Sequence, residues 1–222
     1  YVYVHSYYRY FKVSGDGAVG KASSCLDVSV TPSLTLLYWS ILPAVLALYV
    51  TYFFRNPKRT MVYDPDLILA PADGKVMNIE QIFEDQFFNG PALKITIFII
   101  FDVHINRIPV EGNITFQNYT CGKLKPAYKS SAPFENERHA IGLENDAGMK
   151  VMIIQVAGIL ARRIVSWVGL GDRVQQGQRY GMIKFGSCTE IIMPMNVDIA
   201  VAKGERVKGG KTIIGRISSD NK

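Results

Sequence analysis

The feature that most constrains the fold is an uncharged, strongly apolar run from Leu34 to Phe54. As a helix it would be about 30 Å long, which is enough to cross the hydrocarbon core of a bilayer. Pro43 lies near its middle and either kinks one spanning helix or divides a short re-entrant hairpin. We expect residues 34–55 to anchor the chain in a membrane, and the alternative is a helix buried in a soluble core.

The residues on either side of this run fit a membrane anchor. Its aromatic residues, among them Trp39, are of the types that gather at the membrane–water interface. Arg55, Lys58 and Arg59 follow directly, and basic residues favour a cytoplasmic position. We therefore place the rest of the chain on the cytoplasmic side of the cell (inner) membrane. Residues 1–33 match no functional pattern and form an unassigned N-terminal arm.

Residues 56–222 have the pattern of a β-rich domain. Leu93–Phe101 and Val151–Val156 are apolar runs of strand length, whereas long amphipathic helical stretches are scarce. The motif G-[DE]-R-V-x-x-G occurs twice and includes Asp172–Gly177 and Glu205–Gly210. This repeat suggests two equivalent hairpins in one barrel-like sandwich, so the predicted fold class is mainly β (α+β).

Composition narrows the class of partner. The 222 residues carry a formal net charge of +6, and 48% are hydrophobic, which excludes a disordered chain. A basic protein favours anionic partners such as nucleic acid or anionic lipid, and the uncharged run favours lipid over nucleic acid. The 3 cysteines have no C-x-x-C spacing, which argues against a disulfide framework and against a zinc site.

Several short motifs occur in one order along residues 34 to 216. They are FRNPKRT (Phe54–Thr60), APADGKV (Ala70–Val76), VHINRIP (Val103–Pro109), ENERHAIGLE (Glu135–Glu144), VAGILARRIV (Val156–Val165), GDRVQQGQRYGMIKFGS (Gly171–Ser187) and GERVKGGKTIIG (Gly204–Gly215). Each motif is weak alone, but the ordered set is specific. Together they resemble the phosphatidylserine decarboxylase family in its short form.

The resemblance implies both a fold and a reaction. It implies a barrel-sandwich domain, similar to biotinyl and lipoyl domains, at residues 56–222 behind the membrane helix. It also implies a pyruvoyl-dependent decarboxylase (a carboxy-lyase) that converts phosphatidylserine to phosphatidylethanolamine and CO₂ in phospholipid biosynthesis. The archaeal ether lipid archaetidylserine is an equally open substrate. The cofactor would be a pyruvoyl group made from Ser187, with neither a metal nor pyridoxal phosphate.

The same resemblance assigns Asp73, His104 and Ser187 as catalytic residues. His104 would act as the base for the Ser187 hydroxyl, and Asp73 would hold the imidazole in the required tautomer. The hydroxyl would attack the carbonyl of Gly186, and elimination from the resulting ester would cut this zymogen into residues 1–186 and 187–222. The two fragments would stay associated, and His104 would also supply the proton that replaces CO₂.

Three further residues need an interpretation. Arg107 occupies the position of a second histidine in long-form relatives, and its guanidinium suits a phosphate or carboxylate. We predict that Arg107 contacts the lipid head group, with a structural ion pair equally open. Cys188 is interpreted as a small buried side chain rather than a nucleophile. His139 is interpreted as a loop residue without a catalytic role.

Other functions remain to be weighed. Alone, the PADG segment is a good turn, with Gly74 at positive φ. A biotinyl-type carrier would need a lysine at a hairpin tip, but Ile191–Asn196 has proline there. A membrane-anchored barrel-sandwich adaptor would need coiled-coil heptads, which we do not find. A serine hydrolase could use the same three catalytic residues, and would remain uncleaved. The sequence leaves a homodimer open.

Overall fold

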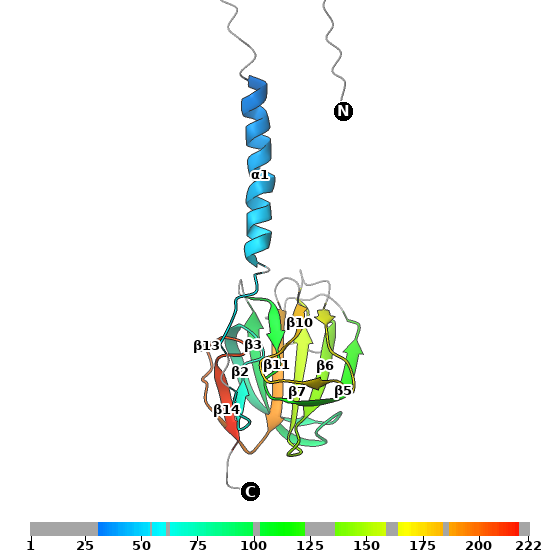
Figure 1. The fold of residues 1–222 in the computed structure, drawn as a ribbon. Helices are drawn as coiled ribbons and strands as arrows, with labels where there is room; N and C mark the ends of the chain where they lie inside the picture. The colour runs from blue at the N-terminus through cyan, green and yellow to red at the C-terminus, as the bar shows by residue number, and fades with distance from the viewer. Residues whose placement is uncertain are drawn as a thin grey trace, which may run out of the picture. The chain divides into compact units, whose positions relative to one another are not determined.

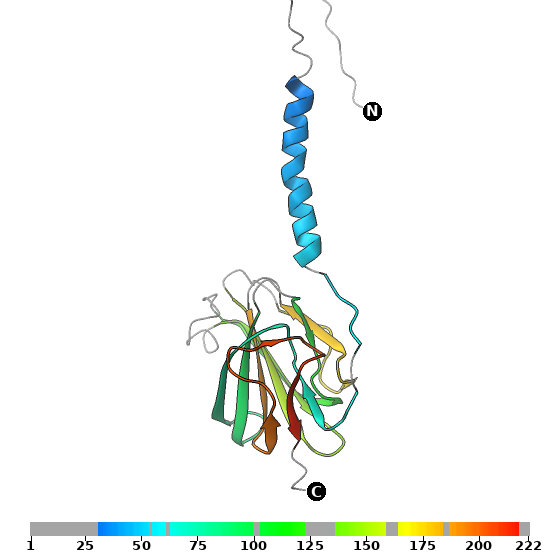
Figure 2. The same cartoon turned by 90° about the vertical axis from the view of Figure 1, so that its left-hand side faces the viewer.

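The structure is a computed structural model that describes residues 31–53, 55–60, 63–99, 103–122, 136–158, 164–183 and 187–217. In these residues one α-helix is followed by a domain of β-strands (Figures 1 and 2), which confirms the mainly β prediction. Contacts divide the chain into two compact units, and the second, Ala47–Lys222, contains every strand.

The helix α1 spans Thr31–Phe53 and continues through Pro43, so the re-entrant hairpin is not supported. Large apolar side chains project into solvent along it, including Trp39 at 78% and Leu48 at 71% exposure. Among the residues that the structure describes, no helix is both long and apolar enough to cross a membrane. The predicted spanning helix is therefore not supported.

The largest sheet has eight strands in the order β13-β2-β3-β11-β7-β6-β5-β9, and each neighbouring pair is antiparallel. The two predicted strands are confirmed as β3 and β7, although β3 ends at Ile99 and residues 100–101 lie outside the described residues. The strands are β2 (Gly74–Glu84), β3 (Gly90–Ile99), β5 (Gly112–Thr120), β6 (Arg138–Glu144), β7 (Lys150–Val156), β9 (Arg173–Val174), β11 (Ser187–Pro194) and β13 (Arg206–Val207).

Two three-stranded sheets complete the domain, in the orders β1-β14-β12 and β4-β10-β8. The large sheet curls into a half-barrel (Figure 2), and the larger of two apolar clusters, made mostly of Ile and Val side chains, joins strands of all three sheets. The remaining strands are β1 (Leu67–Leu69), β4 (Ile105–Arg107), β8 (Ile164–Ser166), β10 (Arg179–Ile183), β12 (Val197–Ile199) and β14 (Ile213–Ile217).

The two repeats form equivalent turns, but they are not the predicted hairpins, because β9 and β13 lie in the large sheet while the strands that follow them, β10 and β14, lie in the three-stranded sheets. Gly171 and Gly204 open the two repeats with φ of 89° and 93°, and Gly177 and Gly210 close them with φ of 77° and 70°. Glycine adopts this left-handed conformation without the steric cost of a Cβ. The strands inside the repeats, β9 and β13, form opposite edges of the large sheet.

The structure extends this repeat to the strands that β9 and β13 meet. Gly112 pairs with Val174 as Gly74 pairs with Val207. A Cβ would lie 2.3 Å from the Phe98 carbonyl oxygen at Gly74, and it would lie 2.5 Å from another carbonyl oxygen at Gly112. The expectation that Gly74 takes positive φ is wrong. Glycine is needed there because the neighbouring strand passes too close for a side chain.

The β domain therefore consists of two similar halves. We call residues 67–99 and 187–217 the Asp73 half, and residues 105–183 the Glu111 half. Each half supplies one three-stranded sheet and four neighbouring strands of the large sheet. The Glu111 half is inserted in the sequence between the two parts of the Asp73 half. The predicted cleavage position lies where the chain returns from the Glu111 half to the second part of the Asp73 half.

Candidate active site

The first residues of β2 and β11 flank the last residues of β3. Lys75 pairs with Phe98 on one side of β3, and Ser187 pairs with Ile99 on the other. Because neighbouring strands lie about 4.8 Å apart, the starts of β2 and β11 are about 10 Å apart. The backbone of Asp73, just before β2, is therefore at the same end of the sheet as that of Ser187.

His104 reaches this end of the sheet through β10. The backbone amide of Ile183, the last residue of β10, donates a hydrogen bond of 3.2 Å to the His104 carbonyl. The chain between Ile183 and Ser187 can span at most about 14 Å. Gly186 lies outside the described residues, but both ends of its segment are placed. The fold thus gathers the segments of Asp73, His104 and Ser187.

The His104 side chain is enclosed. It is 2% exposed, and its ring lies against Phe53 at the end of α1, with ring centroids 4.1 Å apart. An apolar ring at this distance keeps bulk water from one face of the imidazole. A hydrogen bond from the Arg107 backbone amide to the Pro71 carbonyl, at 2.8 Å, joins the His104 motif to the Asp73 motif.

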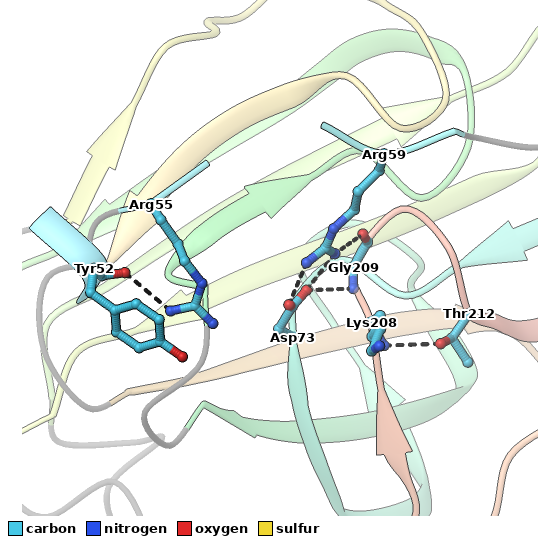
Figure 3. A network of polar contacts seen from close by, with 7 residues as sticks. All are labelled: Tyr52, Arg55, Arg59, Asp73, Lys208, Gly209 and Thr212. Atoms are coloured by element: carbon cyan, nitrogen blue, oxygen red, sulfur yellow. Dashed lines mark hydrogen bonds and ion pairs between the residues drawn. The ribbon is translucent and has the colours of Figure 1, made fainter. Parts of the chain in front are cut away.

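Asp73 is buried and held by three hydrogen bonds (Figure 3). Arg59 donates to both carboxylate oxygens, at 2.6 and 2.5 Å, and the Gly209 amide donates to Oδ1 at 2.7 Å. Arg59 also donates to the Gly209 carbonyl. These three bonds fix the position of the carboxylate. Orientation of His104 by Asp73 stays a prediction.

Sequence reasoning missed Arg59 as the partner of Asp73 and assigned it only to the basic residues after the apolar run. The two residues are far enough apart that no local pattern links them. Bidentate pairing with a carboxylate is characteristic of arginine, whose two N–H groups point the same way. The one feature of the sequence that could have marked Arg59 as a site residue is its position within the FRNPKRT motif.

Arg107 has a structural contact in the described residues. Its side chain is buried, and its guanidinium donates to the Gly177 carbonyl at 3.0 Å. Burial lowers the pKa of Arg107, nearby Arg59 and Arg179 lower it further, and Asp73 opposes the shift. The hydrogen bond supports the turn before β10. Contact with a lipid head group stays a prediction.

Two other interpretations can be compared with the structure. Cys188 is 1% exposed, as expected of a small buried side chain, and burial raises the pKa of its thiol, with Glu190 adding to the shift. The interpretation of His139 as a loop residue is wrong. It lies in β6, between β5 and β7, with 4% exposure, because the apolar residues around it make this segment a central strand.

A cavity of about 290 Å³ opens on the large sheet but is lined by none of the predicted catalytic residues. Its lining combines aliphatic side chains, such as Ile154 and Ile192, with the charged side chains of Glu190 and Lys94. The Lys94 Nζ lies 3.8 Å from Glu190 Oε1 and 2.7 Å from Glu80 Oε1. Burial raises the pKa of Glu190, with Lys94 opposing the shift. In the described part of the chain no three His, Cys, Asp or Glu side chains gather as metal ligands.

Comparison with known proteins gives a consistent result. A family model described as phosphatidylserine decarboxylase matches residues 46–215. The phosphatidylserine decarboxylase proenzyme of Carboxydothermus hydrogenoformans is 48% identical over 192 residues, which cover 86% of this chain and 90% of that protein. The corresponding proenzymes of Symbiobacterium thermophilum and Geotalea uraniireducens are 45% and 41% identical, over 82% and 84% of this chain and 86% and 89% of those proteins.

Proposed function

Because the chain belongs to the phosphatidylserine decarboxylase family, we propose that it decarboxylates phosphatidylserine to phosphatidylethanolamine after cleaving itself before Ser187. The observation that carries the proposal is the convergence at one end of the sheet. The segment of Asp73, the segment of His104 and the start of β11 meet there.

The residues around Asp73 prepare it for cleavage chemistry. Arg59 and Gly209 hold the carboxylate in place. A carboxylate offers about four acceptor positions, and the remaining one would receive the N–H of His104 during the reaction. The other imidazole nitrogen takes the proton of Ser187 as the hydroxyl attacks the Gly186 carbonyl. The amide bond becomes an ester. Elimination then breaks the Cβ–O bond and leaves a carboxylate at residue 186 and dehydroalanine at residue 187. Water converts the dehydroalanine to a ketone with release of ammonia.

The position of Ser187 suits a pyruvoyl group. It begins β11 and pairs with β3, while pairing with β7 starts one residue later, at Cys188. A new N-terminus here would be held by neighbouring strands at the edge of the enclosed His104. The pyruvoyl ketone supplies an electron sink for decarboxylation. His104 would hold the proton that replaces CO₂ on the product, in a pocket closed on one side by Phe53.

The two cleavage fragments would remain interlocked. Residues 187–222 supply β11, β12, β13 and β14, and β11 lies between β3 and β7 of the other fragment. Separating the fragments would break four strand ladders, those of β11 with β3 and β7, of β13 with β2 and of β14 with β1, and would open the core. We further propose that the β domain is a barrel-sandwich, because two similar halves with matching glycine turns are its expected construction.

We also propose that the protein works at the cytoplasmic face of the cell membrane. The phospholipid substrate resides there, and α1 exposes Trp39, Leu42 and Leu48. Such side chains are suited to the boundary between head groups and acyl chains. Arg55 and Lys58 follow the helix and would be attracted to anionic lipid.

Intact-mass measurement of the purified protein tests the proposal. We expect two fragments, residues 1–186 and 187–222, the second with a blocked N-terminus that reacts with borohydride. Ser187→Ala should remain one uncleaved and inactive chain. Release of CO₂ from defined serine lipids, one diacyl and one archaeal ether lipid, then identifies the substrate. An active but uncleaved parent chain would overturn the proposal, because a hydrolase or an adaptor needs no cleavage.

A further inference from the structure

A continuous series of side-chain hydrogen bonds runs from the surface into the core of the β domain and ends beside the proposed cleavage position. The Gln117 amide nitrogen contacts His139 Nε2 at 2.9 Å, and His139 Nδ1 contacts Gln155 Oε1 at 3.4 Å. Gln155 donates to Asn106 at 2.9 Å, and Asn106 donates to Thr189 Oγ1 at 2.9 Å. This chain of hydrogen bonds thus joins β5, β6, β7, β4 and β11.

The hydrogen bond that Gln117 accepts at the surface determines which atom donates in each of the following bonds. The Leu170 backbone amide donates to Gln117 Oε1 at 3.2 Å, so the Gln117 amide nitrogen must be the group that faces His139. His139 Nε2 therefore accepts, and its proton lies on Nδ1, from which it donates to Gln155. Burial lowers the pKa of His139, which agrees with this neutral tautomer.

The inner members of the chain have no exposure to solvent. Asn106, Gln155 and Thr189 are each 0% exposed, so each depends on the others for hydrogen bonding. An unsatisfied amide at this depth would be strongly unfavourable, which makes a single arrangement of the side chains stable. Gly181 leaves room for this arrangement, because a Cβ there would lie 3.0 Å from the Gln155 amide nitrogen.

Thr189 is two residues from Ser187 along β11. Side chains alternate along a strand, so positions 187 and 189 belong to the same face of the sheet. Asn106 is likewise two residues from His104, in the strand that leads away from it. The Asn106–Thr189 bond therefore ties the segment that carries the base to the segment that carries the scissile position.

We propose that Thr189, held by Asn106 at the end of this chain, is a positioning residue that fixes the start of β11 for cleavage. The inference rests on the proposed self-cleavage before Ser187. After cleavage the same bond joins the two fragments, because Asn106 belongs to the first and Thr189 is the third residue of the second. The Asn106–Thr189 hydrogen bond then holds the new N-terminus close to His104, the proposed proton donor.

The test is the first-order rate of cleavage of freshly refolded full-length protein, followed by intact mass and gel electrophoresis. Thr189→Val removes the hydroxyl and keeps the side-chain shape, and we expect cleavage to slow about tenfold, the rate equivalent of one hydrogen bond. Thr189→Ser keeps the hydroxyl and should cleave within about twofold of the parent. Thr96→Val removes a hydroxyl from the neighbouring strand β3 and is the matched control, with an unchanged rate.

Rates are compared only where circular dichroism shows full folding, since the loss of stability alone does not slow an intramolecular reaction in folded molecules. If Thr189→Val does not fold, Gln155→Leu breaks the chain one bond further away and should still slow cleavage. Equal rates for the valine and serine variants, in a parent that does cleave, would overturn the inference alone. A parent that never cleaves would overturn the proposed function and the inference with it.

Discussion

The two halves of the β domain carry an acidic residue at the same place in the same turn, yet only one of the two is enclosed. Asp73 lies in Pro-Ala-Asp-Gly and Glu111 in Pro-Val-Glu-Gly. Asp73 is 5% exposed and accepts three hydrogen bonds. The Glu111 side chain is 30% exposed, and its ion pair with Arg173 is 4.0 Å long. A repeated backbone thus gives the position of the acid without giving its environment.

The difference comes from the segment that precedes the domain. Arg59 from this segment pairs with Asp73, whereas Tyr63 from the same segment donates to Glu111. An arginine brings a permanent charge and two parallel donors, but a tyrosine brings one neutral donor. The comparison indicates that the segment after α1 gives the acids of two similar turns different hydrogen-bond partners.

Removing the charge of each acid should give the largest difference between the two halves in cleavage rate and in stability. We expect Asp73→Asn to slow cleavage at least about a hundredfold, because His104 loses its orienting acceptor. It should also lower the free energy of unfolding by about 3 kcal/mol, because Arg59 is left buried without its partner. Glu111→Gln is the matched control, with a change below about 1 kcal/mol. Urea unfolding and cleavage kinetics measure both, and similar effects in the two variants would contradict the comparison.

Adding a methyl group to each turn tests the backbone that the halves share. Gly74→Ala and Gly112→Ala both place a Cβ against a carbonyl oxygen, at 2.3 and 2.5 Å. Each should lower the free energy of unfolding by about 2–3 kcal/mol, and the two values should agree within about 1 kcal/mol. Only Gly74→Ala should also slow cleavage, because it displaces Asp73. A Gly74→Ala variant as stable as the parent would show that the close approach is not the reason for glycine.

A second buried carboxylate in the Asp73 half, Glu190, should respond to pH in the opposite way to a well-paired acid. Burial raises its pKa above the ordinary value of 4.5, so the folded protein binds this proton more tightly than the unfolded chain. The free energy of unfolding contributed by Glu190 therefore falls as the pH rises above 4.5. Glu190→Gln should remove this slope and be more stable than the parent at pH 7. Urea midpoints between pH 4 and pH 7 measure it, and an unchanged slope would contradict the assignment.

Cys188 should show the smallest functional effect despite its place beside Ser187. Burial raises the pKa of its thiol, so no reactive thiolate is available. Cys188→Ala should cleave within about twofold of the parent and lose about 1 kcal/mol of stability from the missing sulfur. Thiol-directed reagents should leave cleavage of the folded parent unchanged. Inhibition by such a reagent that disappears in Cys188→Ala would assign the thiol a role that we exclude.

Local patterns explain why parts of the fold were predictable. The apolar runs at β3 and β7 have the length of buried strands, and the paired glycines of the two repeated turns have a conformation that few other residues adopt. The motifs around Asp73 and His104 are also local, so their residues could be named as site candidates. The membrane-spanning helix was inferred from the same kind of local evidence and is not supported among the described residues.

The contacts that complete the site could not be predicted, because they join distant parts of the chain. Asn106 and Thr189 are 83 residues apart, and Arg59 reaches Gly209 across 150 residues. His139 was wrongly predicted to lie in a loop for a related reason. Its hydrogen-bond partners, Gln117 and Gln155, come from other strands and cannot be recognised from the residues around it.

Local sequence patterns predicted β3, β7 and the repeated glycine turns, because these depend on neighbouring residues, and the family motifs named Asp73, His104 and Ser187 as candidates. The folded structure was needed to show which of two similar acids is enclosed, and which buried amides meet β11. Burial and hydrogen bonding between distant segments exist only once the chain has folded. They decide how a given side chain is held and what it can do there.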